Sequence, residues 1–348
     1  MEMNSDRATV GIATDRSRAC PRRRRVRLAW LSALLVLGLL GSGKLVPERD
    51  ASAHAAGARI GIGEQKPTMF ASRPWKRLGL RDARYLAPWD VLQDPRQLAL
   101  LDAWMDAAQR AHVRVAISLQ HSLRSPALAR TLPTAAQFGR QFRLLRARYP
   151  TVRDWLPWNE ANSPGSMTEH RPRRAAQYFD VVARACRGCR VVAADVLDTR
   201  GMRDWVRRFQ RAARARPRIW GLHNYVDANQ FSSRGTSTLL ALTRGKIWFT
   251  EVGGLVLRRE YGRRGRGKST FRYGLRLAAR ATAHGLRLSC LSPRITRVYL
   301  YHWQAPRPVT SWDSGLLDAA GRTRPAYDVV ANWIRRGRQS DRVRPPSC

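Results

Sequence analysis

Two glutamates, Glu160 and Glu251, each follow a short apolar run and precede small or turn-forming residues. Glu160 lies in the sequence WNEAN at residues 158–162, and Glu251 lies in WFTEVGG at residues 248–254. Two carboxyl groups about 5–5.5 Å apart can cleave a glycosidic bond with retention, one as proton donor and one as nucleophile. Such a pair works if its surroundings raise the pKa of the proton donor and leave the other group ionised. The two glutamates are therefore candidates for this chemistry.

Eight short apolar runs alternate with helical segments from residue 58 onward. The runs are continuously apolar, as expected for parallel strands covered on both faces. They span residues 58–65, 83–90, 114–120, 155–160, 190–196, 219–225, 246–251 and 297–303. Amphipathic helices are expected at 95–111, 171–186 and 325–336. The count and length predict a single α/β domain, a (β/α)8 TIM barrel over residues 58–336.

Polar side chains end most of these predicted strands. In a TIM barrel all the carboxyl ends of the strands meet at the face that carries the active site. A doubly wound sheet is the alternative fold, but it gives no reason for polar residues at so many strand ends. The strand-end residues are Glu64, Asp90, His121, Glu160, His223, Glu251 and Trp303.

The two glutamate motifs and their order resemble the clan A retaining glycoside hydrolases, over about residues 58–336. The resemblance implies that Glu160 is the acid/base, that Glu251 is the nucleophile and that Asn159 binds the sugar 2-hydroxyl. The chain departs from the usual Asn-Glu-Pro at Ala161. The implied activity is hydrolysis of a β-linked glycan by double displacement. The alternative is a catalytically silent barrel that binds an anionic cell-surface glycan.

The same resemblance assigns the remaining walls of the sugar pocket. His223 and Tyr225 match the His-x-Tyr that ends the sixth strand, and Arg84 matches a common arginine of the second strand. Trp303 matches a tryptophan that forms the floor of the sugar site, and Trp89 is a second candidate for stacking on a sugar. Asp90, His121 and Glu64 complete the predicted pocket. No cofactor is expected, and no metal either, because the histidines lack a short ligand spacing such as HExxH.

Arginine dominates the charge of the chain. Of 64 basic residues 59 are arginine, and the formal net charge is +39. These arginines are spread along the whole chain, which is typical of a high-GC genome rather than of a nucleic-acid-binding surface. No specific nucleic-acid partner is expected. The basic loop from Arg258 to Lys268 either contacts an acidic substrate or is a solvated loop. It contains a phosphate-loop pattern at 262–269 but lacks the flanking strand and helix that such a loop needs.

The N-terminal segment predicts export. Residues 1–27 form a basic tail, and the uncharged residues 28–43 are typical of a signal peptide or a membrane anchor. Residues 44–57 are expected to form a linker, and 337–348 a second basic tail. The protein is expected to be a monomer that is extracellular or anchored to the outer face of the cytoplasmic membrane.

Cys186 and Cys189 form a CxxC sequence. A zinc site needs four ligands, and no second CxxC exists. A redox motif is possible, but no thioredoxin-like pattern surrounds the pair. We expect a local disulfide in the turn between a helix and the fifth strand, at the end of the barrel opposite the active site.

Overall fold

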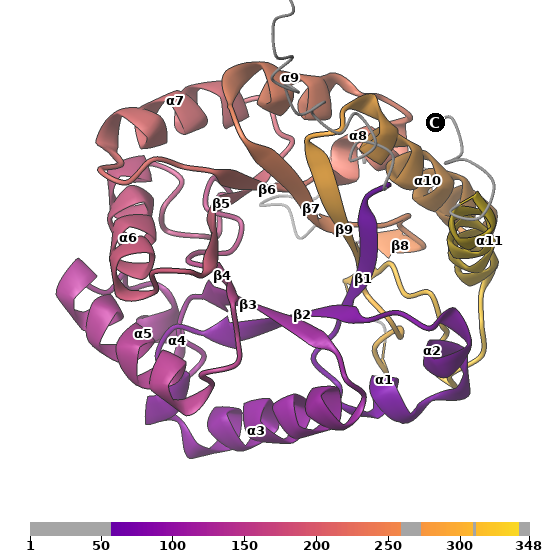
Figure 1. The fold of residues 1–348 in the computed structure, drawn as a ribbon, viewed down its shortest axis with the longest axis horizontal. Helices are drawn as coiled ribbons and strands as arrows, with labels where there is room; N and C mark the ends of the chain where they lie inside the picture. Colours follow the sequence, from indigo (N-terminus) through magenta and orange to yellow (C-terminus); the bar gives the residue numbers. More distant parts are fainter. Residues whose placement is uncertain (1–56, 259–272, 309–310, 341–348) are drawn as a thin grey trace, which may run out of the picture. The chain divides into compact units, whose positions relative to one another are not determined.

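The computed structural model describes residues 57–258, 273–308 and 311–340. Eight parallel strands form a closed barrel in the order β1-β2-β3-β4-β5-β6-β7-β9 (Figure 1). They are Arg59–Gly63 (β1), Asp82–Pro88 (β2), Arg114–Gln120 (β3), Asp154–Leu156 (β4), Arg190–Leu197 (β5), Ile219–His223 (β6), Lys246–Val252 (β7) and Ile295–Tyr301 (β9). The last strand pairs with the first, so the sheet has no free edge. The predicted eight-stranded barrel is confirmed, and the doubly wound sheet is wrong because that sheet is open.

Helices surround the barrel (Figure 1). They are α1 (Thr68–Ala71), α2 (Arg73–Leu78), α3 (Pro95–Arg110), α4 (Pro126–Ala129), α5 (Ala135–Arg148), α6 (Pro172–Ala185), α7 (Met202–Ala212), α8 (Tyr225–Gln230), α9 (Arg234–Leu242), α10 (Leu275–Leu288) and α11 (Pro325–Ser340). Two short 3-10 helices, η2 (Val91–Gln93) and η3 (Ser289–Leu291), complete the set.

Local sequence sets where the longer helices begin. Asp94 accepts hydrogen bonds from the backbone N–H groups of Arg96 and Gln97 at the start of α3, and Pro95 occupies the first helical position. Thr134 and Gln137 form a reciprocal capping box at the start of α5. These caps satisfy N–H groups that would otherwise lack partners, and they fix where the chain turns back along the barrel.

Two apolar cores hold the barrel together. The larger lies between the strands and the helices and includes the fully buried ring of Trp155. Neighbouring residues of a strand point to opposite faces, so the next residue, Leu156, belongs to the second core. This second core is Ala116, Leu156, Val192, Ile219, Trp248 and Tyr299. We place it inside the barrel, where it forms a solid base beneath the carboxyl ends of the strands.

The structure differs from the sequence predictions at a few element ends. The fourth strand ends at Leu156 rather than at residue 160, and the eighth barrel strand ends at Tyr301 rather than at 303. Two strands of two residues each, β8 (Leu257–Arg258) and β10 (Trp312–Asp313), form an antiparallel pair outside the barrel. Helix α11 continues to Ser340, past the predicted barrel limit at residue 336.

Several predicted segments lie outside the described residues. They are the basic tail 1–27, the apolar segment 28–43, nearly all of the linker 44–57, residues 259–272 of the basic loop region and the end of the second tail from residue 341. Within the described part of the chain, every helix is too short or too polar to cross a membrane.

Cys186 and Cys189 are joined by a disulfide in the turn between α6 and β5. The backbone N–H of Cys189 donates to the carbonyl of Cys186 at 3.1 Å, which closes the same turn. Because β5 begins at the next residue, Arg190, the bond lies at the amino-terminal end of the barrel strands. This is the end opposite the strand-end glutamates.

Candidate active site

Arg84 and Tyr225 hold the carboxylate of Glu251. One terminal nitrogen of Arg84 (Nη1), on β2, donates to Glu251 Oε1 at 2.7 Å. The hydroxyl of Tyr225, at the start of α8, donates to Glu251 Oε2 at 3.1 Å. Burial and the negative charge of Glu251 raise the pKa of Tyr225, so this hydroxyl stays a donor. The second terminal nitrogen of Arg84 donates to Asn159 Oδ1 at 2.6 Å.

His223 connects Glu160 to this group. Its Nδ1 lies 3.1 Å from Glu160 Oε1 and 3.7 Å from Glu251 Oε2. One oxygen of each glutamate and one nitrogen of His223 all lie within 4.8 Å of one another. The side chain of Glu160 is 33% exposed, whereas that of Glu251 is 6% exposed. The two carboxylates therefore lie close together beside His223, and Glu160 is the more open to solvent.

The pKa values of Glu160 and His223 are shifted apart. Burial would raise the pKa of Glu160, but the hydrogen bond from His223 and the positive charges of His223 and Arg84 lower it further than burial raises it. Burial would lower the pKa of His223, but the charge of Glu251 and the bond to Glu160 outweigh burial and raise it. Both shifts favour a proton on His223 over a proton on Glu160. A proton donor with a raised pKa was expected, but the shift of Glu160 has the opposite direction.

Glu160 has a left-handed backbone conformation, with φ of 44°. This is uncommon for a residue other than glycine and costs about 1 kcal/mol or more. Backbone hydrogen bonds of the flanking residues hold it in place. The N–H of Asn159 donates to the backbone carbonyl of Leu119 on β3, and the N–H of Ala161 donates to the backbone carbonyl of Asp195 on β5. A proline has no N–H and disfavours this conformation in the residue before it. The alanine in place of the usual proline thus fits the local geometry.

The structure corrects the role predicted for Trp303. Its side chain is 2% exposed and packs edge-on against Trp75 and Tyr327, at ring-centroid distances of 6.1 and 6.2 Å. A ring buried between α2 and α11 cannot form the floor of a sugar site. The half-buried ring that ends β9 is Tyr301. The pKa of Tyr301 is raised by burial and by the charge of Glu251, which indicates that this ring is near the pocket.

Glu64 and Asp90 are almost fully buried and bind loop residues, so their predicted contact with a sugar stays a prediction. Glu64 Oε1 accepts hydrogen bonds from the N–H groups of Gln65 and Lys66, at 2.8 and 3.1 Å. Asp90 Oδ2 accepts from the hydroxyl of Ser122 at 2.7 Å. These carboxylates hold the loops after β1, β2 and β3.

Trp89 and His121 are half-buried at the ends of β2 and β3. The backbone N–H of Trp89 donates to the carbonyl of Gln120 at 2.9 Å, which continues the pairing of β2 with β3 by one residue. Burial lowers the pKa of His121. Both side chains keep exposed surface at the carboxyl end of the barrel strands.

Two residues beside this cluster, Asp195 and Trp312, were not predicted from the sequence. Asp195, within β5, is buried and accepts from Arg84 at 3.2 Å and from Ser118 at 3.0 Å. An acidic residue inside the apolar run RVVAADV is a signal that would have identified it. Trp312, on β10, packs edge-on against Tyr225 at 4.9 Å. The Arg258 guanidinium lies 5.7 Å from the centre of the Trp312 ring.

Glu160, His223 and Glu251 belong to residue types that bind metal ions. However, Arg84 donates to Glu251 at 2.7 Å, and its fixed positive charge already neutralises this side of the pocket. A divalent cation bound there would be repelled by the guanidinium. The guanidinium of Arg84 therefore makes this cluster a poor site for a divalent cation.

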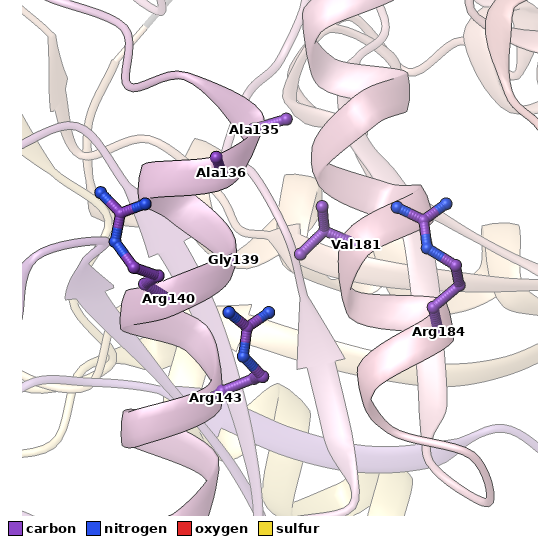
Figure 2. A pocket seen from close by; sticks show the side chains of 7 residues that line it. All are labelled: Ala135, Ala136, Gly139, Arg140, Arg143, Val181 and Arg184. Atoms are coloured by element: carbon purple, nitrogen blue, oxygen red, sulfur yellow. The ribbon is translucent and has the colours of Figure 1, made fainter.

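A hollow of about 430 Å³ lies away from this pocket, between α5 and α6 (Figure 2). It is lined by Ala135, Ala136, Gly139, Arg140, Arg143, Val181 and Arg184. None of these side chains is a carboxylate or a nucleophile, so the hollow cannot carry the same chemistry. In a chain with 59 arginines, three of them around a hollow do not identify a ligand site.

Comparison with known proteins places the chain by its fold. No protein-family model matches the sequence, and no curated protein matches it. Among solved structures, the chain is similar to GH5_18 from Streptomyces cattleya in complex with GlcNAc, with a TM-score of 0.58, 19% identity, and coverage of 81% of this chain and 80% of that one. It is also similar to a GH5_18 from Bifidobacterium longum subsp. infantis, with a TM-score of 0.57, 14% identity, and coverage of 80% and 79%.

A third similar structure is the endo-1,4-beta-xylanase from Caldicellulosiruptor owensensis, with a TM-score of 0.56, 11% identity, and coverage of 81% of this chain and 98% of that one. At these identities the likeness establishes a shared fold. That fold is the (β/α)8 barrel of the clan that the sequence motifs resemble.

Proposed function

We propose that this chain is a retaining glycoside hydrolase that acts on a β-linked glycan, with Glu251 as nucleophile and Glu160 as acid/base. One observation carries the proposal. Glu160 and Glu251 meet beyond the carboxyl ends of β4 and β7, with an oxygen of each within 4.8 Å of the other. This spacing suits retention, whereas inversion needs about 6.5–9.5 Å to admit a water molecule.

In the first step an oxygen of Glu251 attacks the anomeric carbon, and the bond from that carbon to the leaving oxygen breaks. The leaving oxygen takes a proton from Glu160 as the bond breaks. Arg84 and Tyr225 keep the attacking carboxylate in position, each with one hydrogen bond. The product of this step is a glycosyl ester of Glu251 and a free alcohol.

In the second step Glu160, now ionised, removes a proton from a water molecule. The water oxygen bonds to the anomeric carbon from the side that the leaving group vacated, and the Glu251 carboxylate departs. Two displacements on opposite faces restore the original configuration. Glu160 ends the second step protonated and Glu251 ends it ionised, as both are in the glycan complex when the first step starts.

The proton for the first step comes from His223. A glycan in the pocket covers the exposed third of Glu160 and removes water from its carboxylate, which favours the neutral form. The proton then moves from His223 Nδ1 to Glu160 Oε1 across 3.1 Å. The lowered pKa of Glu160 in the open pocket is therefore compatible with its role as acid.

The sugar is proposed to contact Asn159, Trp89, His121 and Tyr301. Asn159 uses its carbonyl oxygen for Arg84, which directs its amide nitrogen elsewhere, and we assign that nitrogen to the sugar 2-hydroxyl. The exposed parts of Trp89 and Tyr301 supply apolar surface for a sugar face, and His121 supplies a ring nitrogen as a hydrogen-bond partner.

The protein is further proposed to be exported. A basic tail followed by the uncharged residues 28–43 supports this localisation. The disulfide between Cys186 and Cys189 supports it too, because structural disulfides persist in oxidising compartments.

The experiment is a screen of aryl β-glycosides and cell-wall polysaccharides with the wild-type protein and the Glu251→Gln variant. The proposal expects at least one substrate that the wild type cleaves and the variant does not. Cleavage at equal rates by both proteins would refute the assigned nucleophile. If no substrate is cleaved although sugars bind, the barrel is a silent glycan-binding protein.

A further inference from the structure

Asp195 is a buried carboxylate that the reaction steps above do not use. It lies near the end of β5, is 1% exposed, and binds Arg84 and Ser118 through Oδ2. Its Oδ1 is buried and has no hydrogen-bond partner among the described residues. Asp195 is thus the second carboxylate on Arg84, beside Glu251.

The fully buried ring of His223 lies between three carboxylates. Its Nδ1 faces Glu160 at 3.1 Å and Glu251 at 3.7 Å, and its Nε2 faces Asp195 Oδ2 at 3.9 Å. Glu160 lies in the turn after β4, Asp195 lies on β5, and Glu251 lies on β7. The guanidinium of Arg84, on β2, bonds two of them. An imidazolium with carboxylates on both of its nitrogens is stabilised relative to the neutral ring.

Gly221 makes room for Asp195. It lies on β6 two residues before His223, so both point to the same face of the strand. A Cβ atom added at Gly221 would overlap Asp195 Oδ1 and would lie 2.9 Å from Thr250 Oγ1. Glycine in a strand interior costs stability. Because Gly221 has no side chain, the carboxylate of Asp195 fits against the strand at this position.

We infer that Asp195 is a positioning residue that holds His223 in its charged form and thereby stores the proton that Glu160 delivers. The inference rests on the proposed function, because it assigns a purpose to that proton. When the proton moves from His223 Nδ1 to Glu160 Oε1, the imidazolium and the carboxylate both become neutral. Asp195 exchanges no proton in this step, and its bond to Arg84 is unchanged.

The test is the pH profile of kcat/KM for Asp195→Asn, a variant of the same shape without the charge. Loss of the proton from the His223–Glu160 pair sets the alkaline limb of the profile. A charge about 4 Å away shifts a pKa by about one unit or more, so the alkaline limb should move to lower pH by at least about one unit. Activity should recover at acidic pH, where the pair is protonated again. A purely structural role would instead lower activity equally at every pH.

Asp154→Asn is the matched control. Asp154 is also a buried barrel aspartate that accepts hydrogen bonds from arginines, Arg190 and Arg297. It lies at the amino-terminal end of β4, whereas Asp195 lies near the carboxyl end of β5. The control variant should lose stability and keep the wild-type pH profile. An alkaline limb that moves equally in both variants, or in neither, would overturn the role of Asp195.

A titration of the His223 ring by NMR tests the inference without any substrate. Its signal is assigned by its loss in His223→Gln. In the wild type the ring should titrate above the ordinary value of about 6.5, and in Asp195→Asn it should titrate lower. If this holds but no glycan is cleaved, the proposed function fails and the charge-setting role of Asp195 stands.

If a glycan is cleaved but the titration of His223 is the same in both proteins, the inference fails alone. If Asp195→Asn does not fold, the NMR titration of His223 in the wild-type protein still tests the inference. A wild-type His223 that is neutral at pH 6.5 would overturn the inference.

Discussion

At the amino-terminal ends of the strands, Asp82 and Asp154 each bind arginine side chains. Both oxygens of Asp82 accept hydrogen bonds from Arg114, at 3.1 and 2.6 Å. Asp154 accepts from Arg190 at 2.5 Å through one oxygen and from Arg297 through the other. Every carboxylate oxygen of this pair of residues has a charged donor. All four carboxylate oxygens at this end are therefore already bound to an arginine.

At the carboxyl ends the same residue types are arranged differently. Glu251 and Asp195 share Arg84, and Glu160 depends on His223. Buried atoms without a hydrogen-bond partner among the described residues gather here, including Asp195 Oδ1 and His223 Nε2. Because Glu251 shares Arg84 with Asp195, its carboxylate can still act as a nucleophile. Because Glu160 is bonded to His223, a proton can move between these two side chains. The incomplete pairing marks the functional end of the barrel, as expected where a site departs from rules that the rest of the fold obeys.

The largest contrast is expected from Glu251→Ala. The variant removes the proposed nucleophile and should lower kcat by about 10⁴-fold or more, because no covalent intermediate can form. Rates on an activated aryl glycoside measure this, and circular dichroism checks the fold. Loss of less than about tenfold would contradict the role of Glu251 and with it the distinction between the two ends.

Glu160→Ala sharpens the assignment within the catalytic end. General acid catalysis contributes about 10²–10⁴-fold, and it matters most when the leaving group is a poor one. The variant should therefore lose that much on a natural glycan and much less on a dinitrophenyl glycoside. A series of aryl glycosides with graded leaving groups measures the slope. An equal loss along the series would argue against Glu160 as the acid.

Asp154→Asn tests the opposite end. Removal of one partner from a buried ion pair costs about 3–5 kcal/mol, because Arg297 is then left buried without its charged partner. The free energy of unfolding in urea should fall by this amount while kcat stays near the wild-type value. A loss of kcat without loss of stability would show that the two ends are not separate in function.

The smallest effect is expected at the disulfide. The loop that Cys186 and Cys189 close is very short, so the chain-entropy contribution is about 2 kcal/mol. The double variant with serine at both positions should melt a few degrees lower and keep its kinetic constants. Thermal unfolding followed by circular dichroism measures the shift. Altered kinetic constants at unchanged melting temperature would contradict a purely structural bond.

The sequence predicts the barrel well because each strand is a separate apolar run. Glu160 and Glu251 were predicted because each ends an apolar run, and Arg84, His223 and Tyr225 were added through the resemblance to the clan; in the structure hydrogen bonds bring these five together. A two-residue strand has no periodicity, so β8 and β10 could not be predicted.

Other features depend on contacts that sequence spacing does not reveal. Trp303 was placed in the pocket because the eighth barrel strand was extended past Tyr301, and that changed which residue ends the strand. The role of Asp195 depends on Arg84, Ser118 and His223, which come from three other strands. The left-handed conformation of Glu160 depends on the backbone hydrogen bonds of its neighbours to β3 and β5.

The central claim is that Glu251 forms a covalent bond to the sugar. The direct measurement is mass spectrometry of the protein after incubation with an activated 2-deoxy-2-fluoro glycoside of the sugar that the screen identifies, since the fluorine slows the second step more than the activated first step. The account predicts one added glycosyl group per chain, on the peptide that contains Glu251. A label on Glu160 instead, or steady turnover of the parent substrate with an inverted product and no label, would contradict it.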